Sequence, residues 1–177
     1  MGTAIDREAH KLAGHDNFAV VEPNHLQAPR SGGVYAQLPA EESIEVLEQG
    51  TFVKYDYANG EVNFTGNGPW MMVFNEEKLY DSQKQMHCDY AMKKADAYNG
   101  VIVPRVFRLY KGDIFTTNNL KAATYEVGDK VAPGADGILA AIEDKDIVAG
   151  NLVLEVAAET TMPDGVQPGL KLRVIAE

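Results

Sequence analysis

From Ser43 onward the chain alternates short apolar runs with turn-forming residues. The runs are rich in Val, Ile, Phe and Tyr and end at Gly, Asn, Asp or Pro, which is typical of β-strands joined by turns. Asn59-Gly60 separates two runs and predicts a hairpin, because both residues tolerate the positive φ of a tight turn. Short strands at this spacing predict a mostly β fold, a small β-barrel or β-sandwich. The predicted strands are 44–48, 51–55, 62–64, 70–74, 101–110, 114–117, 123–127, 137–143, 152–158 and 170–175.

One stretch, residues 75–99, departs from this pattern. Its apolar residues Leu79, Met86, Tyr90 and Ala97 recur at spacings of seven, four and seven, and charged residues surround them. This period predicts an amphipathic helix. The alternative is a long loop with one strand around residues 90–92. In both cases the segment is a short insertion in a β body.

Residues 1–40 show neither a helical nor a strand period and contain several prolines and glycines. We expect an extended N-terminal arm. Its apolar residues Phe18, Val20, Val21 and Leu26 are too sparse to build a core, so the arm should order against a partner surface. On this interpretation residues 41–177 form a β body that folds without the arm.

A weak internal sequence similarity suggests that the body contains two similar lobes. A strand, a tight glycine, a second strand, a glycine-rich turn and a third strand occur over residues 48–73 and again over 110–139. Two copies of a small β unit, residues 41–99 and 100–177, would explain this pattern. Chance similarity between glycine-punctuated β segments is the alternative.

Composition and charge narrow the possible partners. The 177 residues are 45% hydrophobic and 24% charged, which suits a globular fold with a real core. Acidic residues outnumber basic ones by 26 to 16, giving a net charge of -10. Generic binding to nucleic acid depends on Lys and Arg and is therefore not expected. The acidic surface either serves solubility or complements a basic partner surface.

The single cysteine, Cys88, excludes an internal disulfide and zinc sites built from several cysteines. The first residues show no basic segment followed by an apolar run, and no run approaches the ~18 apolar residues of a membrane span. We therefore expect a soluble protein that is made in the cytoplasm, is not exported and does not bind membranes.

Motifs for chemistry are missing from the sequence. There is no phosphate-binding glycine loop and no Gly-x-Ser-x-Gly elbow. The run 86–89, Met-His-Cys-Asp, cannot converge on one atom, because adjacent side chains point in different directions. Glu143, Asp144 and Asp146 fit turns and solvated charge better than a calcium loop. We expect no catalytic residues, no metal and no cofactor.

Trp70, Met71 and Met72 follow directly after Asn67-Gly68-Pro69. Such a cluster is commonly core, and the alternative is an exposed contact patch, since Trp and Met are enriched at interface centres. Together with the arm, this cluster supplies the candidate interface residues: Phe18, Val20, Val21, Leu26, Trp70, Met71 and Met72.

Several strand-turn patterns resemble structural proteins of tailed bacteriophages. They are residues 100–109 (GVIVPRVFRL), 111–118 (KGDIFTTN) and 125–131 (YEVGDKV). Residues 48–56 and the closing segment 133–177 show a similar pattern of short strands and turns. These motifs resemble the compact β domains of capsid decoration, or cement, proteins over roughly residues 44–177. They include no catalytic signature.

The resemblance implies a non-enzymatic virion protein on the capsid exterior. Such a protein binds the major capsid protein lattice, commonly as a homotrimer, and stabilises it against internal pressure. The alternative is another virion surface module, such as a head-fibre base, or a carbohydrate-binding β domain. For the latter, Trp70, Tyr55 and Tyr57 are the aromatic residues able to form a sugar platform. An enzyme is a third, less favoured interpretation.

Overall fold

The computed structural model describes residues 2–6, 18–75, 91–148, 150–163 and 165–177. These residues form a mostly β fold of antiparallel sheets with one short helix, α2 (Ala28–Ser31). Three single-turn 3-10 segments, Lys94–Asp96, Tyr98–Gly100 and Asp144–Asp146, complete the regular structure. The described strands do not close into a barrel, and the arrangement is closer to the predicted sandwich.

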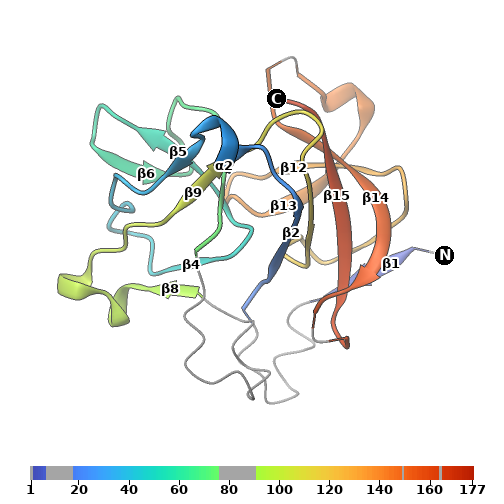
Figure 1. The fold of residues 1–177 in the computed structure, drawn as a ribbon, viewed down its shortest axis with the longest axis horizontal. Coiled ribbons are helices and arrows are strands. Elements are labelled where there is room, and N and C mark those ends of the chain that lie inside the picture. Colours follow the sequence, from blue (N-terminus) through green and yellow to red (C-terminus); the bar gives the residue numbers. More distant parts are fainter. Residues whose placement is uncertain (1, 7–17, 76–90, 149, 164) are drawn as a thin grey trace.

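The larger sheet has six antiparallel strands and lies on the right of Figure 1. The sheet is strongly curled: a β-bridge between Leu120 and Leu139 joins the segment that follows the fifth strand in spatial order to the first strand. In spatial order its strands are β13 (Leu139–Ile142), β12 (Lys130–Pro133), β14 (Val153–Thr161), β15 (Pro168–Ala176), β10 (Ile114–Thr117) and β2 (Val21–His25).

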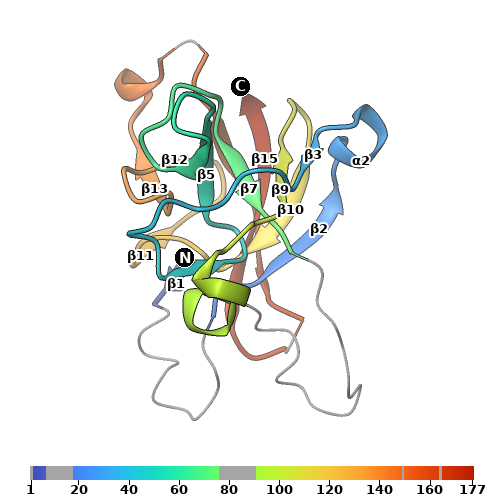
Figure 2. The same cartoon turned by 90° about the vertical axis from the view of Figure 1, so that its left-hand side faces the viewer.

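The second sheet has five antiparallel strands, and Figure 2 shows β5 and β7 beside the curled sheet. Its spatial order is β3 (Val34–Tyr35), β9 (Val106–Arg108), β7 (Met71–Val73), β5 (Phe52–Asp56) and β6 (Glu61–Asn63). Two strand pairs flank the sheets: β1 (Thr3–Ile5) with β11 (Ala123–Tyr125), and β4 (Val46–Glu48) with β8 (Ala91–Lys93). Every predicted strand overlaps an observed one.

The predicted β5–β6 hairpin is confirmed, but its turn differs from the expected one. Residues 57–60 form the turn, and Gly60 alone has a positive φ, of 71°. The Asp56 carboxylate accepts hydrogen bonds from the backbone amides of Ala58 and Asn59, at 3.0 and 3.2 Å. These bonds stabilise a longer turn and make positive φ at Asn59 unnecessary.

Two hydrophobic cores lie on opposite faces of the five-stranded sheet. Phe52 and Met72 join the first core, which also contains the inward side chains of the curled sheet, such as Phe115 and Leu154. Val53 and Met71, their neighbours in sequence, join the second core. Successive side chains of a strand point to opposite faces, so this sheet is covered on both. Its central strand β7 is buried at all three residues.

The second core is closed by a covering layer, which we call the outer layer and define as residues 38–47 and 91–103. Ile44, Leu47 and Ile102 pack into the second core from this layer, and Met92 and Ala97 pack against it. Glu41 and Ala40 of the layer are bonded through their backbone to Val62 and Ile102. The outer layer, which includes most of the β4–β8 pair, thus covers the face of the five-stranded sheet opposite the first core.

Residues 18–40 are part of the β body, which corrects the expectation of a separate arm. Strand β2 pairs with β10 along the edge of the curled sheet, and β3 pairs with β9. Val20 and Val21 are 5% and 6% exposed, and Val21 belongs to the first core. The sequence concealed this role because β2 contains a proline and exposes four of its five side chains, so no apolar alternation remains.

The predicted insertion at 75–99 falls largely on residues 76–90, outside the described residues. Within the described part, residues 91–93 form strand β8 and residues 94–100 form two 3-10 turns. There the helix prediction is wrong, and the alternative of a strand in this region is confirmed. The backbone of β8 pairs with β4, which supplies hydrogen bonds that a helix would have to provide internally.

The two proposed lobes share the five-stranded sheet. Strand β9 belongs to the second predicted lobe, yet it lies between β3 and β7 of this sheet. Conversely, Phe52 and Met72 from the first predicted lobe pack into the first core, with most of its members coming from residues 109–174. The duplication itself stays a prediction.

Replacing Val21 with Ala should lower the free energy of unfolding by about 2 kcal/mol, because it removes buried methyl groups and leaves a cavity. Val127→Ala is the matched control, since Val127 is 61% exposed and should change stability by less than about 0.5 kcal/mol. Urea denaturation measures both. Deletion of residues 1–31 should destabilise the body further; an unchanged midpoint would restore the arm interpretation.

Met72→Ala should cost about 2–5 kcal/mol of stability, because Met72 is 0% exposed at the centre of the five-stranded sheet. Met72→Leu keeps most of the volume and should cost less than about 1.5 kcal/mol. Both values come from the same denaturation measurement. Equal losses for the two variants would contradict a packed first core at this position.

Candidate functional site

The clearest concave feature with converging polar groups is a small cleft at one end of the five-stranded sheet. Its volume is about 150 Å³. Strands β3, β5, β7 and β9 and the turn before β7 all contribute to its wall. We call it the tyrosine cleft, and its lining residues are Tyr35, Tyr55, Tyr57, Gly68, Pro69, Met71 and Arg108.

Three tyrosine rings form the main wall of the cleft. Tyr55 lies between the other two, with ring centroids 5.6 Å from Tyr35 and 5.4 Å from Tyr57. Both contacts are edge-to-face, with interplanar angles of 73° and 88°, which is a favoured arrangement of aromatic pairs. Tyr55 is 3% exposed and Tyr57 is 69% exposed. The cluster therefore runs from the second core to the surface.

The Tyr55 hydroxyl is buried and has no hydrogen-bond partner among the described residues. Burial raises the pKa of Tyr55 above the ordinary value of 10.0, because a phenolate would be poorly solvated there. The nearby backbone amide of Gln37, which does not reach hydrogen-bond geometry, lowers the pKa of Tyr55 by part of this amount. The neighbouring hydroxyls of Tyr57 and Tyr35 raise the pKa further. The aromatic cluster that lines the cleft thus contains a buried polar atom with no partner in the described part of the chain.

The floor of the cleft is positioned by the turn between β6 and β7. The side-chain oxygen of Asn63 accepts hydrogen bonds from the amides of Thr65 and Gly66, at 3.1 and 2.7 Å. A Cβ at Gly66 would lie 2.8 Å from the carbonyl oxygen of Tyr55, so only glycine allows this approach. The turn is therefore held against β5, and it places Gly68 and Pro69 beside the tyrosines.

A second, narrower pocket of about 90 Å³ lies on the other side of Gly68-Pro69, and Trp70 and Arg108 line it. Lys54 holds its ammonium 4.5 Å from the centre of the Trp70 ring, and Arg108 lies 5.4 Å from the centre of the Tyr110 ring. Both contacts are cation–π interactions. Among the described residues neither cation has a carboxylate partner within salt-bridge distance.

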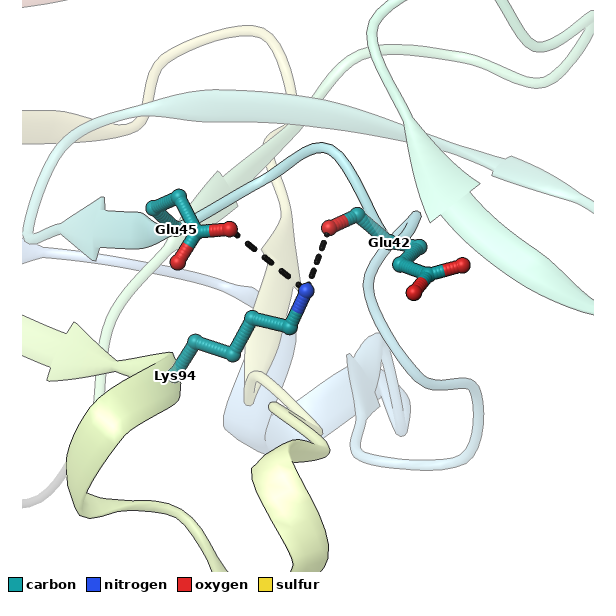
Figure 3. Close-up of polar contacts among 3 residues, drawn as sticks. All are labelled: Glu42, Glu45 and Lys94. Carbon is teal, nitrogen blue, oxygen red and sulfur yellow. Dashed lines mark hydrogen bonds and ion pairs between the residues drawn. The ribbon is translucent and has the colours of Figure 1, made fainter.

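The outer layer carries a wider, open groove of about 420 Å³. Figure 3 shows the polar contact that joins its two segments: the Lys94 ammonium donates to the carbonyl oxygen of Glu42 at 2.8 Å and lies 3.5 Å from the Glu45 carboxylate. Around the groove the outer layer exposes Val46, Tyr98, Val101 and Val103. The outer layer therefore carries both acidic residues and exposed apolar residues.

No group of three or more potential metal ligands is found in the described part of the chain. Glu143 and Asp146 form a capping box around a 3-10 turn, Glu143 pairs with Lys145, and Asp144 pairs with Lys130. These residues thus lie in an exposed turn. The run 86–89 lies outside the described residues. No helix in the described ranges is long and apolar enough to cross a membrane.

The candidate interface residues divide into two groups. Val20, Val21, Met71 and Met72 are 6% exposed or less, so they are buried within this chain. Met71 and Met72 lie in the two cores, as the core interpretation of this cluster expects, and Val21 packs into the first core instead of belonging to a separate arm. Phe18, Leu26 and Trp70 are partly exposed, and Leu26 and Trp70 pack against the first core.

The structure brings Tyr55 and Tyr57 into one cleft, as the sugar-platform alternative requires, and places Trp70 in the adjoining pocket. Tyr35 and Arg108 were missed as members of this site. Tyr35 lies in a two-residue strand, and its sheet partner is distant in sequence. The available signal was Arg108, a charged residue between the apolar residues Phe107 and Leu109 of the predicted strand 101–110.

Comparison with known proteins gives no match: no family model, no curated protein and no solved structure is significantly similar to this chain.

Tyr55→Phe should leave the free energy of unfolding unchanged or slightly higher, because it removes a buried hydroxyl that has no partner. Tyr125→Phe is the matched comparison: the Tyr125 hydroxyl donates to the Lys121 carbonyl at 2.8 Å, and its loss should cost about 1 kcal/mol. Urea denaturation at neutral pH measures both. A clear destabilisation by Tyr55→Phe would show that the hydroxyl is satisfied.

The pH dependence supplies a second measurement on the same pair. Burial raises the pKa of Tyr55 and Tyr125 in the folded state. The unfolded chain therefore loses these protons first, and stability falls as the pH rises above about 10. Each Phe variant should lose less stability than the wild type between about pH 9 and 11.

Proposed function

We propose that this chain is a non-enzymatic structural protein that binds the outer surface of a tailed-phage capsid and stabilises the major capsid protein lattice. The sequence resemblance suggests this class. The observation that carries the proposal is the outer layer, which exposes Val46, Tyr98, Val101 and Val103 beside an acidic groove. Exposed apolar side chains gathered on one covering layer are typical of a protein-binding surface.

The charges around the groove also support the outer layer as the contact surface. Glu41, Glu42 and Glu61 line the groove of the outer layer, and Lys94 is the one cation among its lining residues. On a chain with a net charge of -10, such a face complements a basic patch on a partner. The apolar side chains would then supply the buried centre of the contact and the glutamates its polar rim.

A body with two packed cores supports a role in which the protein resists the internal pressure on a capsid lattice. The five-stranded sheet is packed on both faces, and the curled sheet lies across the first core. A partner that binds the outer layer is thereby coupled to the whole β body through the second core. We propose that the protein acts as a homotrimer on the virion exterior, with no nucleic acid, membrane or cofactor involved.

The test is attachment to emptied, expanded heads of the phage that encodes the chain. The wild type should co-sediment with these heads and raise their melting temperature, and Val101→Glu should weaken retention by about tenfold or more. Val127→Glu is the matched control, because Val127 is also exposed but lies outside the outer layer. Sedimentation velocity of the free protein should show a trimer.

Two results would overturn the proposal. One is a wild-type chain that neither binds the heads nor changes their melting temperature. The other is equal retention of Val101→Glu and Val127→Glu at wild-type level, which would remove the outer layer as the contact surface. Circular dichroism and denaturation of each variant confirm that the β body is intact before the comparison is made.

A further inference from the structure

The tyrosine cleft combines two features that the capsid proposal does not use. Arg108 and Lys54 lie beside it, each against an aromatic ring and without a carboxylate partner in the described part of the chain. In a chain with 26 acidic and 16 basic residues, most cations would be expected to find an acidic neighbour. Arg108 lines the cleft itself and so presents a positive charge to anything that enters.

The second feature is a partly exposed aromatic wall. Tyr57 is 69% exposed, while Tyr55 behind it is buried and fixes the ring by an edge-to-face contact at 5.4 Å. A ring held in this way loses little conformational freedom when a ligand packs against it. Tyr55 itself is 3% exposed and its hydroxyl is buried, so this residue supports the exposed Tyr57 ring from behind.

We propose that the tyrosine cleft binds a carboxylate-bearing sugar residue of an acidic polysaccharide. The sugar ring packs on Tyr57, and its carboxylate pairs with the guanidinium of Arg108. A guanidinium recognises a planar carboxylate through two parallel hydrogen bonds, which lysine cannot reproduce.

The geometry favours a sugar over other ligand classes. The cleft, of about 150 Å³, takes one ring rather than an extended chain. Of the lining residues, Tyr35 alone lies on an edge strand of the sheet, the two-residue β3, so the cleft offers an extended peptide few backbone partners for strand addition. Nucleic acid is disfavoured by the net charge of -10. A hydroxyl-rich ring with one negative group matches the available phenols and the single guanidinium.

Binding is measured by isothermal titration calorimetry of the full chain with an oligogalacturonate of about six residues and with its carboxyl-reduced, neutral counterpart. Trp70 is the sole tryptophan and lines the adjoining pocket, so its fluorescence provides an independent readout. The acidic oligomer should bind, and the neutral one should bind at least about tenfold more weakly, because it lacks the partner of Arg108.

Three variants locate the site. Tyr57→Ala and Arg108→Gln should each weaken binding by about tenfold or more, and Tyr55→Phe, which keeps the ring and removes only a buried hydroxyl, should leave binding unchanged. Tyr98→Ala and Arg30→Gln are the matched controls, because Tyr98 is 89% exposed and Arg30 is exposed, and both lie outside the cleft. Both controls should bind as the wild type does.

The inference fails if neither oligomer binds, if the neutral oligomer binds equally well, or if Tyr57→Ala binds as tightly as Tyr98→Ala. Equal binding of a short acidic peptide such as Glu-Gly-Glu would also overturn the assignment to a sugar. Val101→Glu keeps the cleft and should retain sugar binding, so failure of capsid attachment and failure of sugar binding are separate results.

Discussion

The structure depends on one constraint: the five-stranded sheet must be apolar on both faces. Strand β7 shows this most directly, because Met71, Met72 and Val73 are all at most 3% exposed. Met72 faces the first core and Met71 the second, so neither position tolerates a polar side chain without leaving it unsatisfied. Both the curled sheet and the outer layer are anchored to the molecule through this sheet.

The same constraint fixes where functional groups can lie. Side chains in the middle of the sheet are occupied by packing, so polar chemistry is confined to the strand ends. The tyrosine cleft lies at such an end, where Arg108 closes β9 and the turn at Gly68-Pro69 enters β7. Tyr55 is the residue that links the two regions, because it belongs to the second core and also lines the cleft.

Strands with strong local signals could be predicted from the sequence. Pairing and burial that depend on residues distant in the sequence could not. The segments 52–56 and 114–117 carry β-branched and aromatic residues between clear turns, and both are strands. The run Trp70-Met71-Met72 was ambiguous, because a strand covered on both faces is uninterrupted in apolar character and resembles an exposed patch in sequence. Strand β2 was missed for the opposite reason: its one buried side chain, Val21, gives no period.

The candidate site follows the same division. Tyr55 and Tyr57 are two residues apart and were identifiable as a possible platform, whereas Tyr35 joins them only through the pairing of β3 with β9. The turn that forms the floor depends on Asn63 and Gly66, whose roles are visible only in the hydrogen bonds and the close backbone approach. Spacing along the chain cannot reveal contacts that sheet order creates.

Pro23 in β2 has a consequence for how copies of this chain can associate. Strand β2 is an edge of the curled sheet, and an edge strand is a template on which another chain can add a strand. Proline contributes no amide donor, and the exposed carboxylate of Glu22 adds charge beside it. Backbone-mediated growth from this edge is therefore disfavoured, so copies of the chain that meet at β2 would do so through its exposed side chains.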